Sequence, residues 1–176
     1  MNSTVVISKK NQVGPDFVPY GLSLIIDLKD RCFDVRYEDE LMNRYALRAA
    51  NQMFKDALEH GVGRFMLTSA FRSYSTQVLI YDSNEDKSYV ALPGQSEHHT
   101  GYAFDLYYDK EDPSVESRFQ YLYDNCYKYG IILRYPSDKE DITGFPYEPW
   151  HFRFVGKRAA AYIYKHGLCL EEYVER

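Results

Sequence analysis

Two short segments far apart in the chain carry side chains that suit a metal ion, and their joint use requires a fold that brings them together. In the first segment, His98 and His99 precede a predicted strand that contains Asp105. In the second, His151 follows Glu148 by three positions and opens another predicted strand. A catalytic zinc typically takes three protein ligands and keeps one position for water. Two ligands from the first segment and one from the second converge if the two strands are neighbours.

The residues around these side chains fit such a site. Side chains alternate along a strand, so Ala103 and Asp105 share one face, and the small Ala103 leaves room in front of the carboxylate. Gly101 permits a sharp backbone bend between the histidines and the strand. Pro149 disfavours helix at Glu148. We therefore expect this glutamate and the histidine after it to meet across a turn entering a strand, not along a helix.

Each of these residues also has an ordinary structural interpretation. A single histidine on a strand is more often a hydrogen-bonded polar residue than a metal ligand, and the pair Trp150 and His151 is compatible with simple packing. The combination is more specific than its parts. Ser-x-His-x-x-Gly-x-Ala-x-Asp, followed later by Glu-x-Trp-His, favours a metal site.

Composition limits the class of protein. The 176 residues match the size of one ordinary domain, and 45% hydrophobic residues supply a core. A formal net charge of −5 makes a nucleic acid an unfavourable partner. The three cysteines form no C-x-x-C pair, which favours reduced thiols. We find neither a secretory signal pattern nor an apolar run of membrane length, so we expect a cytoplasmic protein with no membrane anchor in this chain.

Periodicity and turn residues predict one α+β domain over residues 1–176, with a small central antiparallel sheet flanked by helices. Residues 1–34 alternate short apolar runs with Gly and Pro and are expected to wrap the domain as extended chain. The predicted helices cover 38–60, 73–86, 112–130 and 157–166, with a further turn at 170–174, and the predicted strands cover 64–69, 103–108, 131–135 and 150–155.

These residues resemble the signature of the zinc D-alanyl-D-alanine carboxypeptidases and dipeptidases, the VanY, VanX and VanXY group of peptidase M15 type. The signature positions are Ser96, His98, Gly101, Ala103, Asp105, Glu148, Trp150 and His151. Segments 69–73, 129–136, 142–144 and 170–173 also match, so the resemblance spans roughly residues 11–173. It is greatest to the cytoplasmic VanXY-type bifunctional D,D-peptidases. The chain departs from the family at Ala70 and Phe71, where relatives carry Gly and Tyr, and at His99, where many carry Gln.

The resemblance implies a hedgehog/D,D-peptidase-like zinc fold with one Zn²⁺ per chain. It assigns the ligands to His98, Asp105 and His151. Zinc makes its bound water acidic enough to supply hydroxide near neutral pH. By the same resemblance, Glu148 is the general base that takes the water's proton and returns it to the leaving amine, and Arg72 stabilises the oxyanion.

The resemblance also implies the substrate contacts. It places Gln77 and Ser96 near the C-terminal D-Ala of the substrate, and Trp150 is expected in the pocket wall. His99 is expected to point the other way along an extended backbone. It then serves as a hydrogen-bond donor around the site or at its rim instead of a ligand.

These roles predict a zinc D,D-peptidase that cleaves the terminal D-Ala-D-Ala bond of the free dipeptide, of peptidoglycan pentapeptide precursors, or of both, and contributes to vancomycin-type glycopeptide resistance. Two alternatives remain. An L,D-carboxypeptidase trimming peptidoglycan tetrapeptides would use the same metal chemistry, and a non-catalytic zinc-bearing module would bind cell-wall peptides without turnover. The sequence leaves open the ratio of dipeptidase to carboxypeptidase activity, the discrimination among D-Ala, D-Ser and D-lactate ends, the native metal and the oligomeric state.

Overall fold

The computed structural model describes residues 2–176, which form an α+β fold as predicted. The strands are β1 (Leu22–Leu24), β2 (Asp34–Val35), β3 (Leu41–Asn43), β4 (Met66–Ser69), β5 (Ala103–Leu106), β6 (Ile131–Leu133) and β7 (His151–Phe154). The α-helices are α1 (Ile25–Leu28), α2 (Arg44–Glu59), α3 (Tyr74–Ser83), α4 (Val115–Asn125), α5 (Glu140–Thr143), α6 (Lys157–His166) and α7 (Leu170–Glu175). Two 3₁₀ helices are η1 (Glu97–Thr100) and η2 (Cys126–Tyr129).

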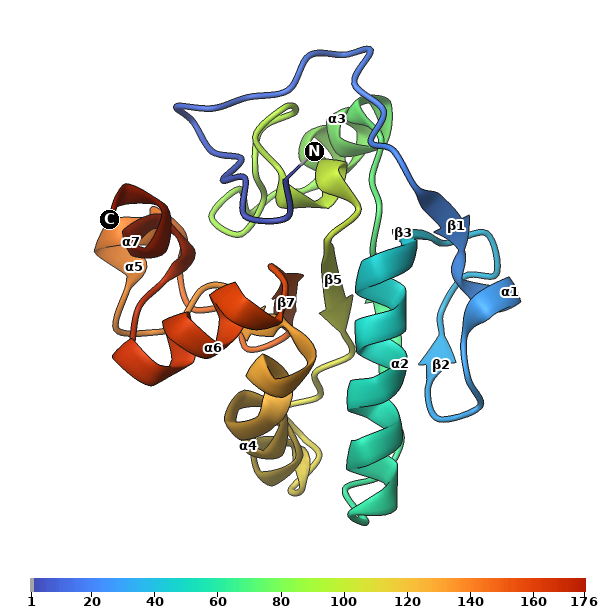
Figure 1. Ribbon diagram of the computed structural model, residues 1–176. Coiled ribbons are helices and arrows are strands. Elements are labelled where there is room, and N and C mark those ends of the chain that lie inside the picture. Colours follow the sequence, from blue (N-terminus) through green and yellow to red (C-terminus); the bar gives the residue numbers. More distant parts are fainter. Residues whose placement is uncertain (1) are drawn as a thin grey trace.

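The central sheet has five strands in the order β2-β4-β5-β7-β6, and β1 pairs with β3 in a separate two-stranded sheet. The pairs β4–β5, β5–β7 and β6–β7 are antiparallel, as expected. The edge pair β2–β4 is parallel, which the prediction of an antiparallel sheet missed. The chain between these two strands contains α2, and a crossover through a helix is the usual connection of parallel neighbours. In the view of Figure 1, α2 stands to the right of β5, while α4 and α6 lie to its left.

The register of β5 and β7 is the feature of the fold that matters most for the site. Asp105 and His151 are direct partners across these two strands, and Asp105 also pairs with Ser69 of β4. The side chains of Asp105 and His151 therefore project from directly opposed backbone positions on neighbouring strands. The predicted neighbourhood of the two strands is confirmed.

The N-terminal segment is more structured than the extended wrap that we expected. It contains β1 and α1, and it leads into β2 of the central sheet. Before β1 it runs across the top of the molecule in Figure 1. The Ser3 hydroxyl donates to the Val155 carbonyl, with 3.0 Å between the oxygens, so the beginning of this segment is held beside the end of β7.

The helix α2 supplies one wall of the core. It begins at Arg44, not near residue 38, because Leu41–Asn43 pairs with β1 and Asn43 caps the helix by accepting from the Tyr45 amide. Its buried face packs in a cluster with aromatic residues that include Phe33, which precedes β2, and Phe104 of β5. The helix predicted over 112–130 is divided into α4 and η2. Within residues 2–176, we find no helix with the length and apolar character that crossing a membrane requires.

Gly101 makes the bend between η1 and β5, and its replacement gives a first prediction. Its φ is +69°, and an added Cβ would lie 2.7 Å from Leu22 Cδ2 and 3.3 Å from the Asn43 amide nitrogen. We expect Gly101→Ala to lower the free energy of unfolding by about 1–3 kcal/mol, measured from urea denaturation midpoints. Gly61→Ala is the control, because Gly61 has a φ of +74° with nothing within 4 Å of the added Cβ. Equal losses in the two variants would show that the close packing at Gly101 is unimportant.

Candidate active site

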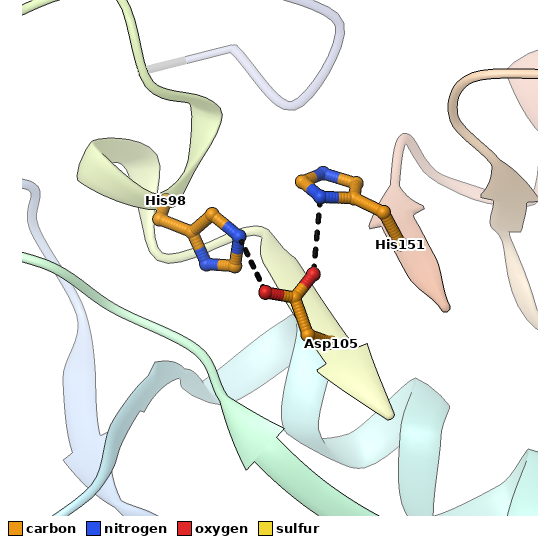
Figure 2. A group of neighbouring side chains, drawn as sticks. All are labelled: His98, Asp105 and His151. Carbon is orange, nitrogen blue, oxygen red and sulfur yellow. Dashed lines mark ion pairs between the residues drawn. The ribbon is translucent and has the colours of Figure 1, made fainter. Parts of the chain in front are cut away.

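Three elements bring His98, Asp105 and His151 together. These residues come from η1, β5 and β7, and one possible ligand atom from each lies within 4.8 Å of the others. The Nε2 atom of His98 lies 3.2 Å from Asp105 Oδ2, and Nδ1 of His151 lies 3.1 Å from Asp105 Oδ1. Figure 2 shows both rings turned toward the carboxylate between them. The predicted convergence of the two segments is therefore what the fold produces.

Local hydrogen bonds orient the His98 ring. Its Nδ1 donates to the Ala70 carbonyl oxygen at 2.5 Å, which leaves the lone pair of Nε2 facing Asp105. Such a backbone partner fixes the tautomer of a histidine that binds a metal through its other nitrogen. His98 Nε2 and Asp105 Oδ1 are buried and make no hydrogen bond within residues 2–176. Two imidazoles and one carboxylate, with unsatisfied buried atoms on His98 and Asp105 that face the site, fit a catalytic zinc, which takes three such ligands.

The charges of the three side chains depend strongly on each other. Burial, with Arg72 nearby, lowers the pKa of His98 to about 4, so this imidazole is neutral at physiological pH and able to bind a metal. Burial also opposes the charged form of His151, but the Asp105 and Glu148 carboxylates together outweigh it and raise the pKa of His151 to about 9. Burial disfavours the Asp105 carboxylate as well, yet the facing histidines hold its pKa well below the ordinary value.

Glu148 lies beside the three residues. Its backbone nitrogen donates to the Tyr135 carbonyl, and its carbonyl accepts from the His151 amide in the turn that enters β7. Glu148 Oε2 is 3.3 Å from His151 Nδ1, and the side chain is almost fully buried. This is the turn geometry that the sequence predicted for the pair. A pocket of about 60 Å³ is lined by Glu148 together with Ser96 and Trp150.

Arg72 reaches the same pocket and is held by three contacts. Its guanidinium donates to Asp105 Oδ2 at 2.9 Å, to Ser69 Oγ at 3.0 Å and to Gln77 Oε1 at 3.2 Å. Gln77 is fully buried, and its amide nitrogen also donates to the Ala91 carbonyl at 2.8 Å. The residues that line the pocket do not include Gln77. Gln77 thus supports Arg72 from behind, whereas Ser96 and Trp150 stand in the pocket wall.

His99 points away from the three residues, as expected, but its setting differs from the prediction. It lies in the 3₁₀ helix η1, not in extended chain, and it is buried, not at a rim. Its Nδ1 donates to the Arg72 carbonyl at 2.8 Å, and its Nε2 accepts from the Gly94 amide at 3.1 Å. Both ring nitrogens are occupied by backbone groups. His99 therefore fixes the loop that carries Arg72.

A larger groove continues from the small pocket. It has a volume of about 800 Å³ and shares Arg72, Tyr89 and Trp150 with the pocket. Among its other lining residues are Asp39 and Glu40, which precede β3. The sequence interpretation missed Tyr89, whose ring centroid lies 5.9 Å from that of Trp150. No sequence signal marked it, because it lies in an irregular loop.

The fold and these side chains define a candidate metallohydrolase with a small buried site and an open groove. Residues 39–157 match the VanY family, described as D-alanyl-D-alanine carboxypeptidase, and the chain belongs to this family. The resemblance found in the sequence is thereby confirmed. The chain is therefore a peptidase of the carboxypeptidase type.

Individual relatives agree with this assignment. The chain is 35% identical to a protein named putative carboxypeptidase YodJ from Bacillus subtilis, over 99% of this chain and 68% of YodJ. Among solved structures, the LdcB LD-carboxypeptidase has a TM-score of 0.82 at 34% identity, covering 97% of this chain and 84% of LdcB. A mutant of the D,D-pentapeptidase VanY, from a VanB-type vancomycin resistance cassette and in complex with Zn(II), has a TM-score of 0.80 at 29% identity, covering 98% of both chains.

Several curated relatives are longer than the region that matches. Three from Enterococcus, which include the bifunctional D-Ala-D-Ala dipeptidase and carboxypeptidase VanXYC, are matched over 34% to 52% of their own length. The similarity to VanY and VanXY proteins that the sequence predicted is confirmed by VanXYC and by the solved VanY structure.

Proposed function

We propose that this chain is a zinc-dependent D,D-carboxypeptidase that removes the terminal D-Ala from peptidoglycan pentapeptide precursors. The observation that carries the proposal is the buried group of His98, Asp105 and His151 with Glu148 beside it, in a chain of the VanY family. The solved VanY relative in complex with Zn(II) supports zinc as the metal. The group of His98, Asp105 and His151 would hold one such ion per chain. We extend the proposal to hydrolysis of the free dipeptide D-Ala-D-Ala. We also extend it to a contribution to glycopeptide resistance, because vancomycin binds D-Ala-D-Ala ends and this hydrolysis removes them.

Each residue of the site has a defined task in this reaction. Bound zinc would supply an acidic water and polarise the scissile carbonyl. The Glu148 carboxylate lines the pocket next to His151, where it can accept the proton of the attacking water and pass it to the leaving amine. The Arg72 guanidinium lines the same pocket and would donate hydrogen bonds to the oxyanion.

The shape of the site favours peptides over the free dipeptide. The pocket of about 60 Å³ suits only a small terminal group, and it continues into the groove of about 800 Å³. A longer peptide would occupy both spaces, whereas a dipeptide would leave the groove unused. Ser96 and Trp150 in the pocket wall are proposed to contact the terminal D-Ala. Gln77 is proposed to act on the substrate through Arg72, which it holds.

The similarity to LdcB favours a second candidate function, L,D-carboxypeptidase action on tetrapeptides. Amino-acid release from three substrates separates the candidates: D-Ala-D-Ala, a pentapeptide ending in D-Ala-D-Ala, and a tetrapeptide ending in L-Lys-D-Ala. We expect the fastest release from the pentapeptide, and no release from any substrate after chelation. Faster release from the tetrapeptide would establish the L,D activity instead. Binding of the peptides without release would identify a non-catalytic module.

Arg72 is expected to act in the transition state. Because donors aimed at a developing oxyanion typically contribute 10²–10³ in rate, we expect Arg72→Gln to lower kcat by about 10²–10³-fold with a smaller change in KM. Steady-state kinetics on the pentapeptide measure both constants. Arg158→Gln, at an exposed position of α6, is the control. A rise in KM with unchanged kcat would assign Arg72 to ground-state binding instead.

A further inference from the structure

A buried cluster of charges lies directly behind the candidate active site. Its centre is Glu97, which is 1% exposed and precedes His98 in η1. Glu97 Oε1 accepts from Arg134 Nε at 2.8 Å, and Oε2 lies 3.1 Å from an Arg153 terminal nitrogen. Both arginines are almost completely buried as well. A buried carboxylate held between two buried guanidiniums is costly to desolvate, so its presence beside the site needs an explanation.

The same carboxylate faces His151. Glu97 Oε2 is 3.9 Å from His151 Nε2, and that nitrogen is buried with no hydrogen bond within residues 2–176. On the other edge of the ring, Nδ1 is 3.1 Å from Asp105 Oδ1. Glu148 Oε2 lies 3.3 Å from the same Nδ1. The imidazole thus lies between Glu97 behind it and the carboxylates of Asp105 and Glu148 on the side of the candidate metal site.

We propose that Glu97 is a positioning residue for His151, which keeps the proton of the neutral imidazole on Nε2 and the lone pair of Nδ1 directed into the site with Asp105. This inference rests on the proposed metal site. A carboxylate behind a ligating histidine selects the tautomer and makes the ligand more basic. His98 also has a partner behind its ring, since its Nδ1 donates to the Ala70 carbonyl at 2.5 Å. For His151 the corresponding partner is the Glu97 carboxylate at 3.9 Å from Nε2, an ion-pair distance.

The partners of the arginines anchor Glu97 to both ends of the chain. Arg134 donates to both carboxylate oxygens of Glu171 in α7, at 2.9 and 2.5 Å. Arg153 donates to the backbone carbonyls of Ser3 and Val5, both at 3.0 Å. The two guanidiniums therefore fix the position of the Glu97 carboxylate relative to β6 and β7. Arg134 and Arg153 thus link Glu97 to α7 and to the N-terminal segment, and Glu97 is the member of this cluster whose carboxylate faces His151.

The tautomer of His151 tests the proposal on the wild-type protein. In the zinc-loaded, ¹⁵N-labelled chain, nitrogen chemical shifts and long-range couplings identify which ring nitrogen carries hydrogen. We expect Nε2 of His151 to be protonated and Nδ1 to be bound to metal. A proton on Nδ1 with the metal on Nε2 would overturn the proposal. This measurement does not depend on whether any variant folds.

The second test is zinc affinity, measured by competition with a chromogenic chelator. We expect Glu97→Gln to weaken zinc binding by about 10–100-fold, which is the typical effect of mutating a partner of a metal-ligating histidine. Glu171→Gln is the matched control: it removes a carboxylate from the same arginine cluster but does not contact His151. We expect Glu171→Gln to lower thermal stability with zinc affinity near that of the wild type. Equal zinc affinity in Glu97→Gln and wild type, or equal weakening in both variants, would refute the positioning role. Absence of zinc binding in the wild type would instead refute the proposed function.

Discussion

Replacing Glu148 with alanine is expected to abolish most of the peptidase activity while the protein keeps its fold and its metal. Glu148 lines the pocket and lies 3.3 Å from His151 Nδ1, but it is outside the group of three proposed ligands. Removing it takes away the proposed proton acceptor and leaves His98, Asp105 and His151 in place. General acid–base catalysis typically contributes 10²–10⁴-fold, so we expect kcat to fall by about that factor.

Amino-acid release from the pentapeptide measures this loss, and elemental analysis measures zinc in the same sample. The control is Glu111→Ala, which removes an exposed glutamate from the loop before α4. We expect this control to match the wild type in both measurements. Near-normal turnover in Glu148→Ala would contradict the assignment of the general base. Loss of zinc in Glu148→Ala would instead make Glu148 a ligand.

The second large effect is expected from His98→Ala. With one imidazole gone, only Asp105 and His151 remain of the three proposed ligands, and two ligands are too few for a tightly bound catalytic zinc. We expect the purified variant to contain far less than one zinc per chain. Its rate of peptide hydrolysis should equal that of wild-type protein treated with a chelator. Added zinc should restore hydrolysis in the chelator-treated wild type but not in the variant.

The neighbouring histidine supplies the matched control. His99 is buried like His98, but both of its ring nitrogens contact backbone groups outside the metal site. We therefore expect His99→Ala to retain one zinc per chain, even if the loop that carries Arg72 becomes less stable. Retention of zinc in His98→Ala with loss of zinc in His99→Ala would reverse the assignment of the two histidines.

The sequence carried enough information to predict the centre of the site. Alternation along β5 places Asp105 on a defined face, and Pro149 predicts the turn that brings Glu148 to His151. Such local rules depend on residues within a few positions of each other. The pairing of β5 with β7 followed from the requirement that the candidate ligands meet, and the structure contains it.

The parts that sequence analysis missed depend on contacts between distant residues. Glu97 meets Arg134 across 37 positions in the chain, and no local pattern marks either residue as a partner of the other. The parallel pairing of β2 depends on the path of α2, and β3 replaces the predicted first turns of that helix because it has β1 as a partner. His99 is buried in the 3₁₀ helix η1, and the sequence analysis, which expected extended chain at this position, did not predict that burial.

The binding of one metal ion by His98, Asp105 and His151 is the central claim, and anomalous diffraction at the zinc absorption edge tests it most directly. Crystals of the zinc-loaded chain are predicted to contain one anomalous peak, within bonding distance of His98 Nε2, an Asp105 carboxylate oxygen and His151 Nδ1. A peak elsewhere, or no peak in a crystal of protein saturated with zinc, would contradict the claim.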